Sequence, residues 1–210
     1  IDVRVPLARN NNTAFINTLQ RQILGHWQHV DLKLANRSFN SHLLMTGIEY
    51  QKDRTQKINI GIINQPFYQS FYGINERKGI FLQDLWQLNT AHSLILGVRY
   101  DKSRIANENL HPRLGWIWQQ DKNSTVKLMY GSAFRAANLQ EFSQNVPFER
   151  PTPSPEQIKT TELSYEKFLT PTSNYKVTLF QSQLSDLIGL DFVGGYYVNE
   201  APLQSRGIEV

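Results

Sequence analysis

The chain has 210 residues, a formal net charge of +4 and 19% charged residues, a composition of neither disordered tails nor strongly basic nucleic-acid binders. It contains no cysteine, which excludes disulfide frameworks, thiol nucleophiles and cysteine-ligated metals. No run of about 18 apolar residues occurs, so transmembrane helices are excluded, whereas barrel strands need only about 9 to 11 residues of alternating polarity. The first residues also lack the features of a signal peptide, and we expect the chain to be a fragment of a longer protein.

Alternating apolar and polar residues predict about ten β-strands, and the first three lie before residue 52. These three expected strands are residues 2–8, 24–34 and 42–51. Residues 52–77 are polar and contain Pro66 and several aromatic residues, which predicts a long loop with a short hairpin or helix.

The clearest alternation lies in the middle of the chain, in expected strands at 79–88, 93–101, 112–119 and 125–135. In each of these strands one face is apolar and the other is mixed and charged. Asp84 interrupts the apolar face of the first of them. In a membrane barrel the apolar face would contact lipid. The residues expected there are Leu94, Leu96, Val98, Tyr100, Leu114, Trp116, Trp118, Val126, Leu128 and Tyr130.

The last three expected strands are residues 158–168, 175–188 and 197–210. Short and long connections then alternate along the whole chain, which predicts an up-and-down meander with tight turns at one end and long loops at the other. The short turns are 36–41, 89–92, 120–124 and 169–173, and the long connections are 9–23, 52–77, 102–110, 137–157 and 189–196.

The side chains on the two faces favour a membrane barrel over a soluble all-β binding module, although both remain open. Several Tyr and Trp residues lie near strand ends, as expected at bilayer interfaces. Charged residues share the face opposite the apolar one, where they would line a lumen. They are Glu49, Arg99, Asp101, Arg113, Lys127, Arg135, Glu162 and Glu166.

An ordered series of phrases resembles the barrel of the TonB-dependent outer-membrane receptors. The phrases are GVRYD (97–101), PRLGW (112–116), YGSAFRAANLQEF (130–142), SPEQIKTTELSYEKF (154–168), LFQSQLSDLIGL (179–190) and GIEV (207–210). The resemblance implies an all-β, antiparallel up-and-down transmembrane barrel in the bacterial outer membrane, of which residues 1–210 form an incomplete segment. In that family a barrel of about 22 strands encloses a plug domain, and the plug and the remaining strands are absent here. The implied partners are TonB, reached through the missing plug, the outer-membrane lipid and a chelated nutrient.

The resemblance also bears on the ligand. Haem receptors of the family commonly have a histidine in the loop that corresponds to residues 137–157, and this loop has none. A ferric siderophore is therefore the expected ligand, with haem and cobalamin as alternatives. The chain departs from the family at Ala137, where proline is frequent, and at RPTPSPE (150–156), which replaces an Asn-Pro phrase. These departures leave the subfamily open.

The expected ligand-binding residues combine aromatic and cationic side chains at the long loops, which suits an anionic, aromatic chelate. They are Arg135, Phe148, Arg150, Tyr196 and Tyr197. For Arg135 a structural role is favoured, because an arginine in a lumen needs a permanent partner, and Glu141 and Glu156 are the candidates.

Neither a metal site nor catalysis is expected. The five histidines have no convergent ligands around them. The sequence contains no nucleophile elbow, paired-carboxylate signature or phosphate-binding glycine loop. We therefore expect a non-enzymatic protein without a cofactor.

Overall fold

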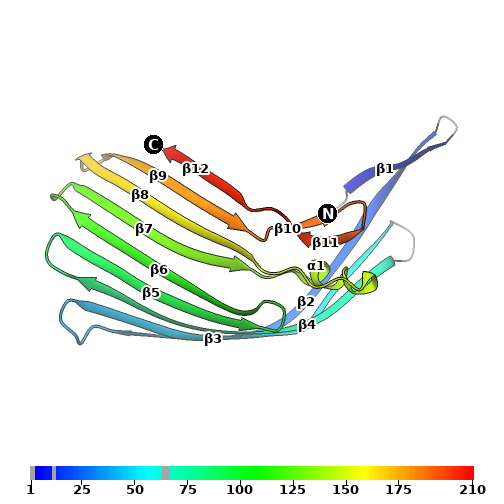
Figure 1. The fold of residues 1–210 in the computed structure, drawn as a ribbon, viewed down its shortest axis with the longest axis horizontal. Helices are drawn as coiled ribbons and strands as arrows, with labels where there is room; N and C mark the ends of the chain where they lie inside the picture. Colours follow the sequence, from blue (N-terminus) through cyan, green and yellow to red (C-terminus); the bar gives the residue numbers. More distant parts are fainter. Residues whose placement is uncertain (1–2, 11–12, 63–66) are drawn as a thin grey trace.

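Antiparallel strands form one curved sheet in the computed structural model, which describes residues 3–10, 13–62 and 67–210, with side chains for 20–62 and 69–210 (Figure 1). Ten strands make up this sheet in the order β1-β2-β3-β4-β5-β6-β7-β8-β9-β12, which confirms the predicted up-and-down order. They are β1 (Val3–Asn10), β2 (Thr13–Asn36), β3 (His42–Ile62), β4 (Phe67–Gln87), β5 (His92–Ser103), β6 (Asn107–Gln119), β7 (Ser124–Arg135), β8 (Glu156–Thr170), β9 (Ser173–Ser185) and β12 (Leu203–Glu209).

The expected last two strands, 175–188 and 197–210, have wrong bounds. After β9 the chain leaves the sheet and forms a separate hairpin of β10 (Ile188–Asp191) and β11 (Tyr196–Asn199) before it returns as β12. Asp186, with a φ of 56°, begins the departure in the left-handed region. Pro202, which has no N–H for a strand ladder, precedes the return.

Three of the expected long connections are wrong. Most of 9–23 belongs to β1 and β2, and most of 52–77 belongs to β3 and β4; residues 11–12 and 63–66 lie outside the described part. The segment 102–110 shrinks to residues 104–106 between β5 and β6. In β3 the polar run 52–56 and a register shift between Asp53 and Gln56 interrupt the alternation, which resumes at Ile58, Ile60 and Ile62.

Two long connections remain, and both leave the end of the sheet opposite the short turns (Figure 1). The first, residues 136–155, contains helix α1 (Leu139–Ser143) and the 3-10 turn η1 (Val146–Phe148). The second, residues 186–202, contains the β10–β11 hairpin. None of the helices in the described ranges is long and apolar enough to cross a membrane.

The predicted division of the sheet into two faces is reproduced by the strand register. The pairs Leu96↔Leu114, Trp118↔Val126 and Trp116↔Leu128 connect the ten expected outward residues on a single face. Side chains on this face stay exposed, at 42% for Leu96, 48% for Leu114 and 42% for Leu128. An exposed apolar surface of this extent is unusual for a soluble monomer.

Charged residues on the opposite face pair with each other. Arg99 donates to Glu49 Oε2 at 2.7 Å and to both carboxylate oxygens of Asp101 at 2.7 Å. Lys127 Nζ lies 3.7 Å from Glu166 Oε2. These pairs neutralise much of the wall charge without an external partner.

Asp84 does lie on the apolar face, as the sequence indicated. Its Oδ2 is 2.7 Å from Nδ1 of His42, whose ring stacks on Trp86 at a centroid distance of 5.3 Å. The histidine thus provides a polar partner for a carboxylate in an otherwise apolar environment.

Candidate functional site: the joined loops at one end of the sheet

The residues predicted to bind ligand lie in or next to the two long connections, 136–155 and 186–202. Helix α1 begins with a capping box, in which the Asn138 side chain accepts from the N–H of Gln140 at 2.9 Å and of Glu141 at 3.0 Å. Glu141 Oε2 accepts from the Asn138 N–H at 2.8 Å. The N-x-x-E spacing is the local sequence signal for this helix start.

Helix α1 is anchored on the polar face of the sheet by Leu139. This side chain is 6% exposed and packs with Ile58 of β3 and Phe71 of β4 in the small buried cluster of the described residues. Gly73 lies directly beneath it, and a Cβ at this position would collide with the Leu139 side chain. The helix is therefore fixed over the C-terminal part of β3 and the N-terminal part of β4.

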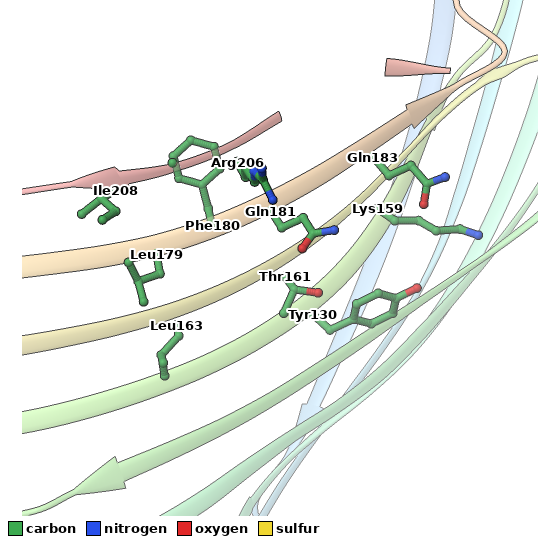
Figure 2. A pocket seen from close by; sticks show the side chains of 11 residues that line it. Tyr130, Lys159, Thr161, Leu163, Leu179, Phe180, Gln181, Gln183, Arg206 and Ile208 are labelled. Atoms are coloured by element: carbon green, nitrogen blue, oxygen red, sulfur yellow. The ribbon is translucent and has the colours of Figure 1, made fainter. Parts of the chain in front are cut away.

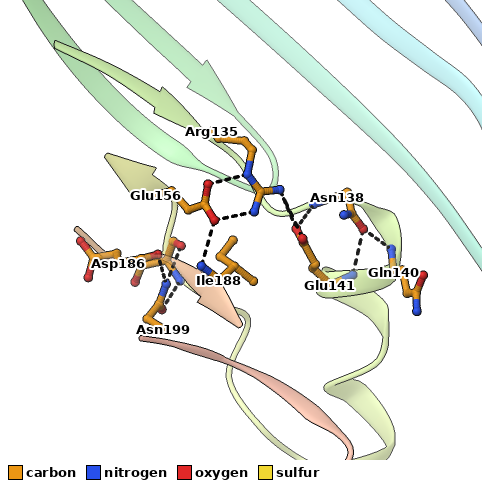
Figure 3. A network of polar contacts seen from close by, with 9 residues as sticks. Arg135, Asn138, Gln140, Glu141, Glu156, Asp186, Ile188 and Asn199 are labelled. Atoms are coloured by element: carbon orange, nitrogen blue, oxygen red, sulfur yellow. Dashed lines mark hydrogen bonds and ion pairs between the residues drawn. The ribbon is translucent and has the colours of Figure 1, made fainter. Parts of the chain in front are cut away.

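Arg135, the last residue of β7, connects four elements (Figure 3). Its Nε donates to Glu156 Oε2 at 2.5 Å and its Nη2 to Glu156 Oε1 at 2.6 Å, so β7 and β8 are joined by a bidentate pair. Its Nη1 donates to Glu141 Oε2 in α1 at 3.0 Å. Glu156 Oε1 also accepts from the Ile188 N–H of β10 at 2.9 Å.

The charges in this network stabilise one another. Hydrogen bonds from Arg135 hold the pKa of the Glu156 carboxyl below its usual range, against the opposing effect of burial. Hydrogen bonds to Glu156 and Glu141 raise the pKa of Arg135. Both carboxylates that the sequence named as partners thus contact the guanidinium, which remains charged at any physiological pH.

Two asparagines join the loops to each other. Asn145, only 1% exposed, donates to the carbonyl oxygens of Pro151 and Tyr197 at 2.8 Å each and accepts from the Tyr197 N–H at 2.7 Å. Asn199 accepts from the Ser154 N–H at 2.8 Å and donates to the Ser154 carbonyl at 3.0 Å. We call residues 136–155 and 186–202 together the loop unit.

Three of the five predicted ligand-binding residues meet on the loop unit. The Arg150 guanidinium lies 4.7 Å from the centroid of the Tyr196 ring, and the Phe148 ring lies 5.9 Å from the same ring. Phe148 is 48% exposed. The cluster of Phe148, Arg150 and Tyr196 therefore combines a cation with two aromatic rings at a surface.

The other two predicted residues are placed elsewhere. Tyr197 follows Tyr196 on β11 and so points to the opposite side of that strand. Burial raises the pKa of its hydroxyl, and the negative charge of Glu141 adds to this shift. Arg135 belongs to the ion-pair network beneath the loop unit.

Metal ligation finds no support in the residues that the structure describes, where no three His, Asp or Glu side chains converge. The Asp191 carboxylate in the hairpin instead accepts from the N–H groups of Val193 at 3.0 Å and Gly194 at 3.1 Å, which lowers its pKa. It serves as a turn acceptor.

A curved up-and-down sheet, with short turns at one end and a loop unit at the other, is the wall of a β-barrel. A family model described as "TonB dependent receptor-like, beta-barrel" matches residues 3–210. The chain therefore belongs to the TonB-dependent receptor family, as part of its β-barrel. Among curated proteins, no sequence matches the chain.

Solved receptor structures share this fold at low sequence identity. The siderophore receptor PirA from Pseudomonas aeruginosa has 18% identity and a TM-score of 0.67 over 92% of this chain and 36% of its own. The ferric enterobactin receptor PfeA from the same organism, solved with enterobactin, has 18% identity and a TM-score of 0.67 over 95% and 34%. The FrpB iron transporter from Neisseria meningitidis has 16% identity and a TM-score of 0.65 over 94% and 33%. This chain spans about a third of their length.

Proposed function

We propose that the chain is the barrel-wall part of a bacterial outer-membrane receptor that takes up a ferric siderophore with energy passed through TonB. The observation that carries this proposal is the cluster of Phe148, Arg150 and Tyr196 on the loop unit of a family barrel. An anionic chelate with aromatic groups matches a surface that offers a guanidinium and two rings. The structural relatives named for siderophores or iron favour the same ligand class.

The proposed orientation rests on the two faces of the sheet and on the contrast between the short turns at one end and the loop unit at the other. The apolar face contacts lipid, the paired charges of the opposite face line the lumen and meet the plug, and the loop unit lies outside the cell. TonB would act through the plug. Under this proposal, transport belongs to the complete receptor and ligand capture to its loops.

The two candidate arginines differ in whether their charge is already paired. Arg135 donates four hydrogen bonds to Glu141 and Glu156 and acts as a scaffold residue. Arg150 has no carboxylate within 4.0 Å among the described residues, and its guanidinium lies over the face of Tyr196. We therefore assign ligand contact to Arg150, Tyr196 and Phe148.

The direct test is titration of the complete receptor with ferric siderophores, haem and cobalamin, followed by tryptophan fluorescence. We expect a ferric siderophore to bind, and Arg150→Ala to weaken this binding about tenfold, or about 1.4 kcal/mol. Arg37→Ala is the matched control, because Arg37 lies in an exposed turn at the opposite end of the sheet. Binding of haem alone, or of cobalamin alone, would overturn the assignment of the ligand.

A further inference from the structure

Strands β6 and β7 separate before they reach the loop unit. Their last pair is Arg113↔Gly131, although both strands continue beyond it. Residues 107–112 of β6 pair with β5 and residues 132–135 of β7 pair with β8, and within the described structure these two segments do not pair with each other. We call the boundary between the two segments the seam.

Pro112 explains where the seam begins. The Gln119 N–H donates to the Ala91 carbonyl on the β5 side of the strand. Because N–H groups alternate sides along a strand, position 112 faces β7, and a proline has no N–H to donate there. The next side chain closes the first part of the seam, since the His111 ring stacks on Phe134 at a centroid distance of 4.9 Å.

A cavity of about 540 Å³ lies beside the rest of the seam, next to the first residues of the loop unit. Its apolar lining is aliphatic and comes from β2, β3, the turn between β5 and β6, and the start of the loop unit. These side chains are Ile23, Ile58, Ile105, Ala137 and Leu139. Phe134, the aromatic residue of the lining, already stacks on His111. The lining therefore suits a flexible aliphatic chain better than an aromatic ring.

The cavity can be reached from the lumen side of the wall. Asp101 on the lumen face and Lys102 on the outer face both line it, so it borders both faces at the end of β5. Another large hollow of the described sheet lies on β7, β8, β9 and β12 (Figure 2), and its polar side chains all belong to the outer face. That hollow faces lipid, whereas the cavity at the seam lies on the path of a ligand from the loops.

Three residues of the lining show that the cavity has room for an apolar group. Ile23 remains 66% exposed on the lumen side of β2. A Cβ at Gly25 would meet nothing within 4 Å. Ala137 has a smaller side chain than the proline that is frequent at this place in the family, and it is only 5% exposed. The cavity thus gives a physical meaning to a departure from the family sequence.

We propose that this cavity binds the aliphatic acyl tail of an amphiphilic ferric siderophore. The chelate would lie on the cluster of Phe148, Arg150 and Tyr196, and the tail would lie between Ile23, Gly25 and Leu139. Helix α1 begins at Leu139 and spans about 8 Å, so only this helix and η1 separate the two regions. The inference rests on the proposed function and names the subclass of its ligand.

The test uses the complete receptor in lipid nanodiscs and two synthetic probes. These are the ferric complexes of one tris-catecholate amine that is acylated with acetyl or with n-octanoyl. Each methylene group that leaves water strengthens binding about fourfold. Because the octanoyl chain has six more methylene groups and the cavity encloses only part of it, we expect at least tenfold higher affinity for the octanoyl probe, measured by tryptophan fluorescence.

Gly25→Phe places a ring in the cavity, where a Cβ has free space. It should lower the affinity for the octanoyl probe at least fivefold and that for the acetyl probe less than twofold. Thr55→Phe is the matched control, because Thr55 is exposed, pairs with His26 in the adjacent row and lies outside the lining. It should change neither affinity more than twofold. Ile105→Trp fills the cavity from the turn and replaces Gly25→Phe if heat-modifiable gel mobility shows that this variant is not folded.

Equal affinities of the unmodified receptor for the two probes would overturn the inference. An octanoyl advantage that persists in Gly25→Phe would also overturn it, because the chain would then lie in the bilayer. If both probes bind equally and their binding depends on Arg150, only the tail site is rejected and the proposed function stands. If neither probe binds, the proposed function is rejected, and the inference falls with it.

Discussion

Replacing Arg135 with alanine should destabilise the loop unit without removing a ligand contact. The substitution deletes four hydrogen bonds of 2.5 to 3.3 Å to Glu156 and Glu141. The two carboxylates are only 18% and 11% exposed and would be left near each other without their cation. Desolvated pairs of this kind cost about 3–5 kcal/mol to break, and exposed ones less than about 1 kcal/mol. Because the Arg135 side chain is 45% exposed, we expect an intermediate loss of about 2 kcal/mol.

The assay is urea unfolding of the complete receptor in lipid vesicles, followed by tryptophan fluorescence, together with siderophore titration. Arg135→Ala should lower the unfolding midpoint and change affinity less than threefold. Arg135→Lys should recover less than half of the loss, because an ammonium cannot form the bidentate pair. Arg150→Ala is the internal control and should show the opposite pattern. Unchanged stability together with abolished siderophore binding in Arg135→Ala would refute the scaffold role.

Three further perturbations probe the same end of the sheet. The lowered pKa of Glu156 contributes stability that is fully present above the pKa of the unfolded chain, about 4.3, and is lost as the pH falls through the lower folded pKa. The urea concentration at the unfolding midpoint should therefore decrease when the pH is lowered below about 4.3. Glu156→Gln should make this decrease smaller. Asn145→Ala removes three hydrogen bonds, so it should speed hydrogen exchange at the Tyr197 amide roughly tenfold or more, as measured by mass spectrometry. Unchanged protection of this amide would contradict the prediction. Gly73→Ala should detach α1 and increase protease cleavage in the loop unit, because the added Cβ collides with Leu139. Gly25→Ala is the control and should not increase cleavage, because a Cβ there has nothing within 4 Å. Equal cleavage of the two variants would count against the docking of α1.

The sequence was informative where one face of a strand is committed to an apolar environment. The alternation in residues 93–101 and 125–135 predicted β5 and β7 almost to their ends and identified the face that carries Leu96 and Leu128. It failed in 52–77, because the polar run 52–56 and a register shift between Asp53 and Gln56 interrupt the alternation of β3 before it resumes at Ile58, Ile60 and Ile62. Strand existence was thus easier to predict than strand length.

The candidate site was predictable in composition and only partly in arrangement. The ion pairs of Arg135 with Glu141 and Glu156 could be predicted, because an arginine in a lumen needs carboxylate partners and few carboxylates lie near it in the chain. The N-x-x-E signal of α1 was present in the sequence and could have been recognised. The link from Asn145 to Tyr197 joins residues 52 positions apart, and no local pattern encodes it. Tyr196 and Tyr197 point to opposite sides only because they lie on a strand of the β10–β11 hairpin, and the alternation of the sequence did not predict this hairpin.

Site-directed spin labelling tests the central claim that this sheet is a receptor barrel wall with its apolar face in lipid. Nitroxides are placed at each residue of 93–101 in the complete receptor in vesicles, and their collision with oxygen and with a polar nickel complex is measured. We predict that labels at Leu94, Leu96 and Val98 collide with oxygen and are shielded from nickel, while Gly97 and Arg99 show the reverse. High oxygen and low nickel accessibility at Gly97 and Arg99, or no alternation along the strand, would contradict the account.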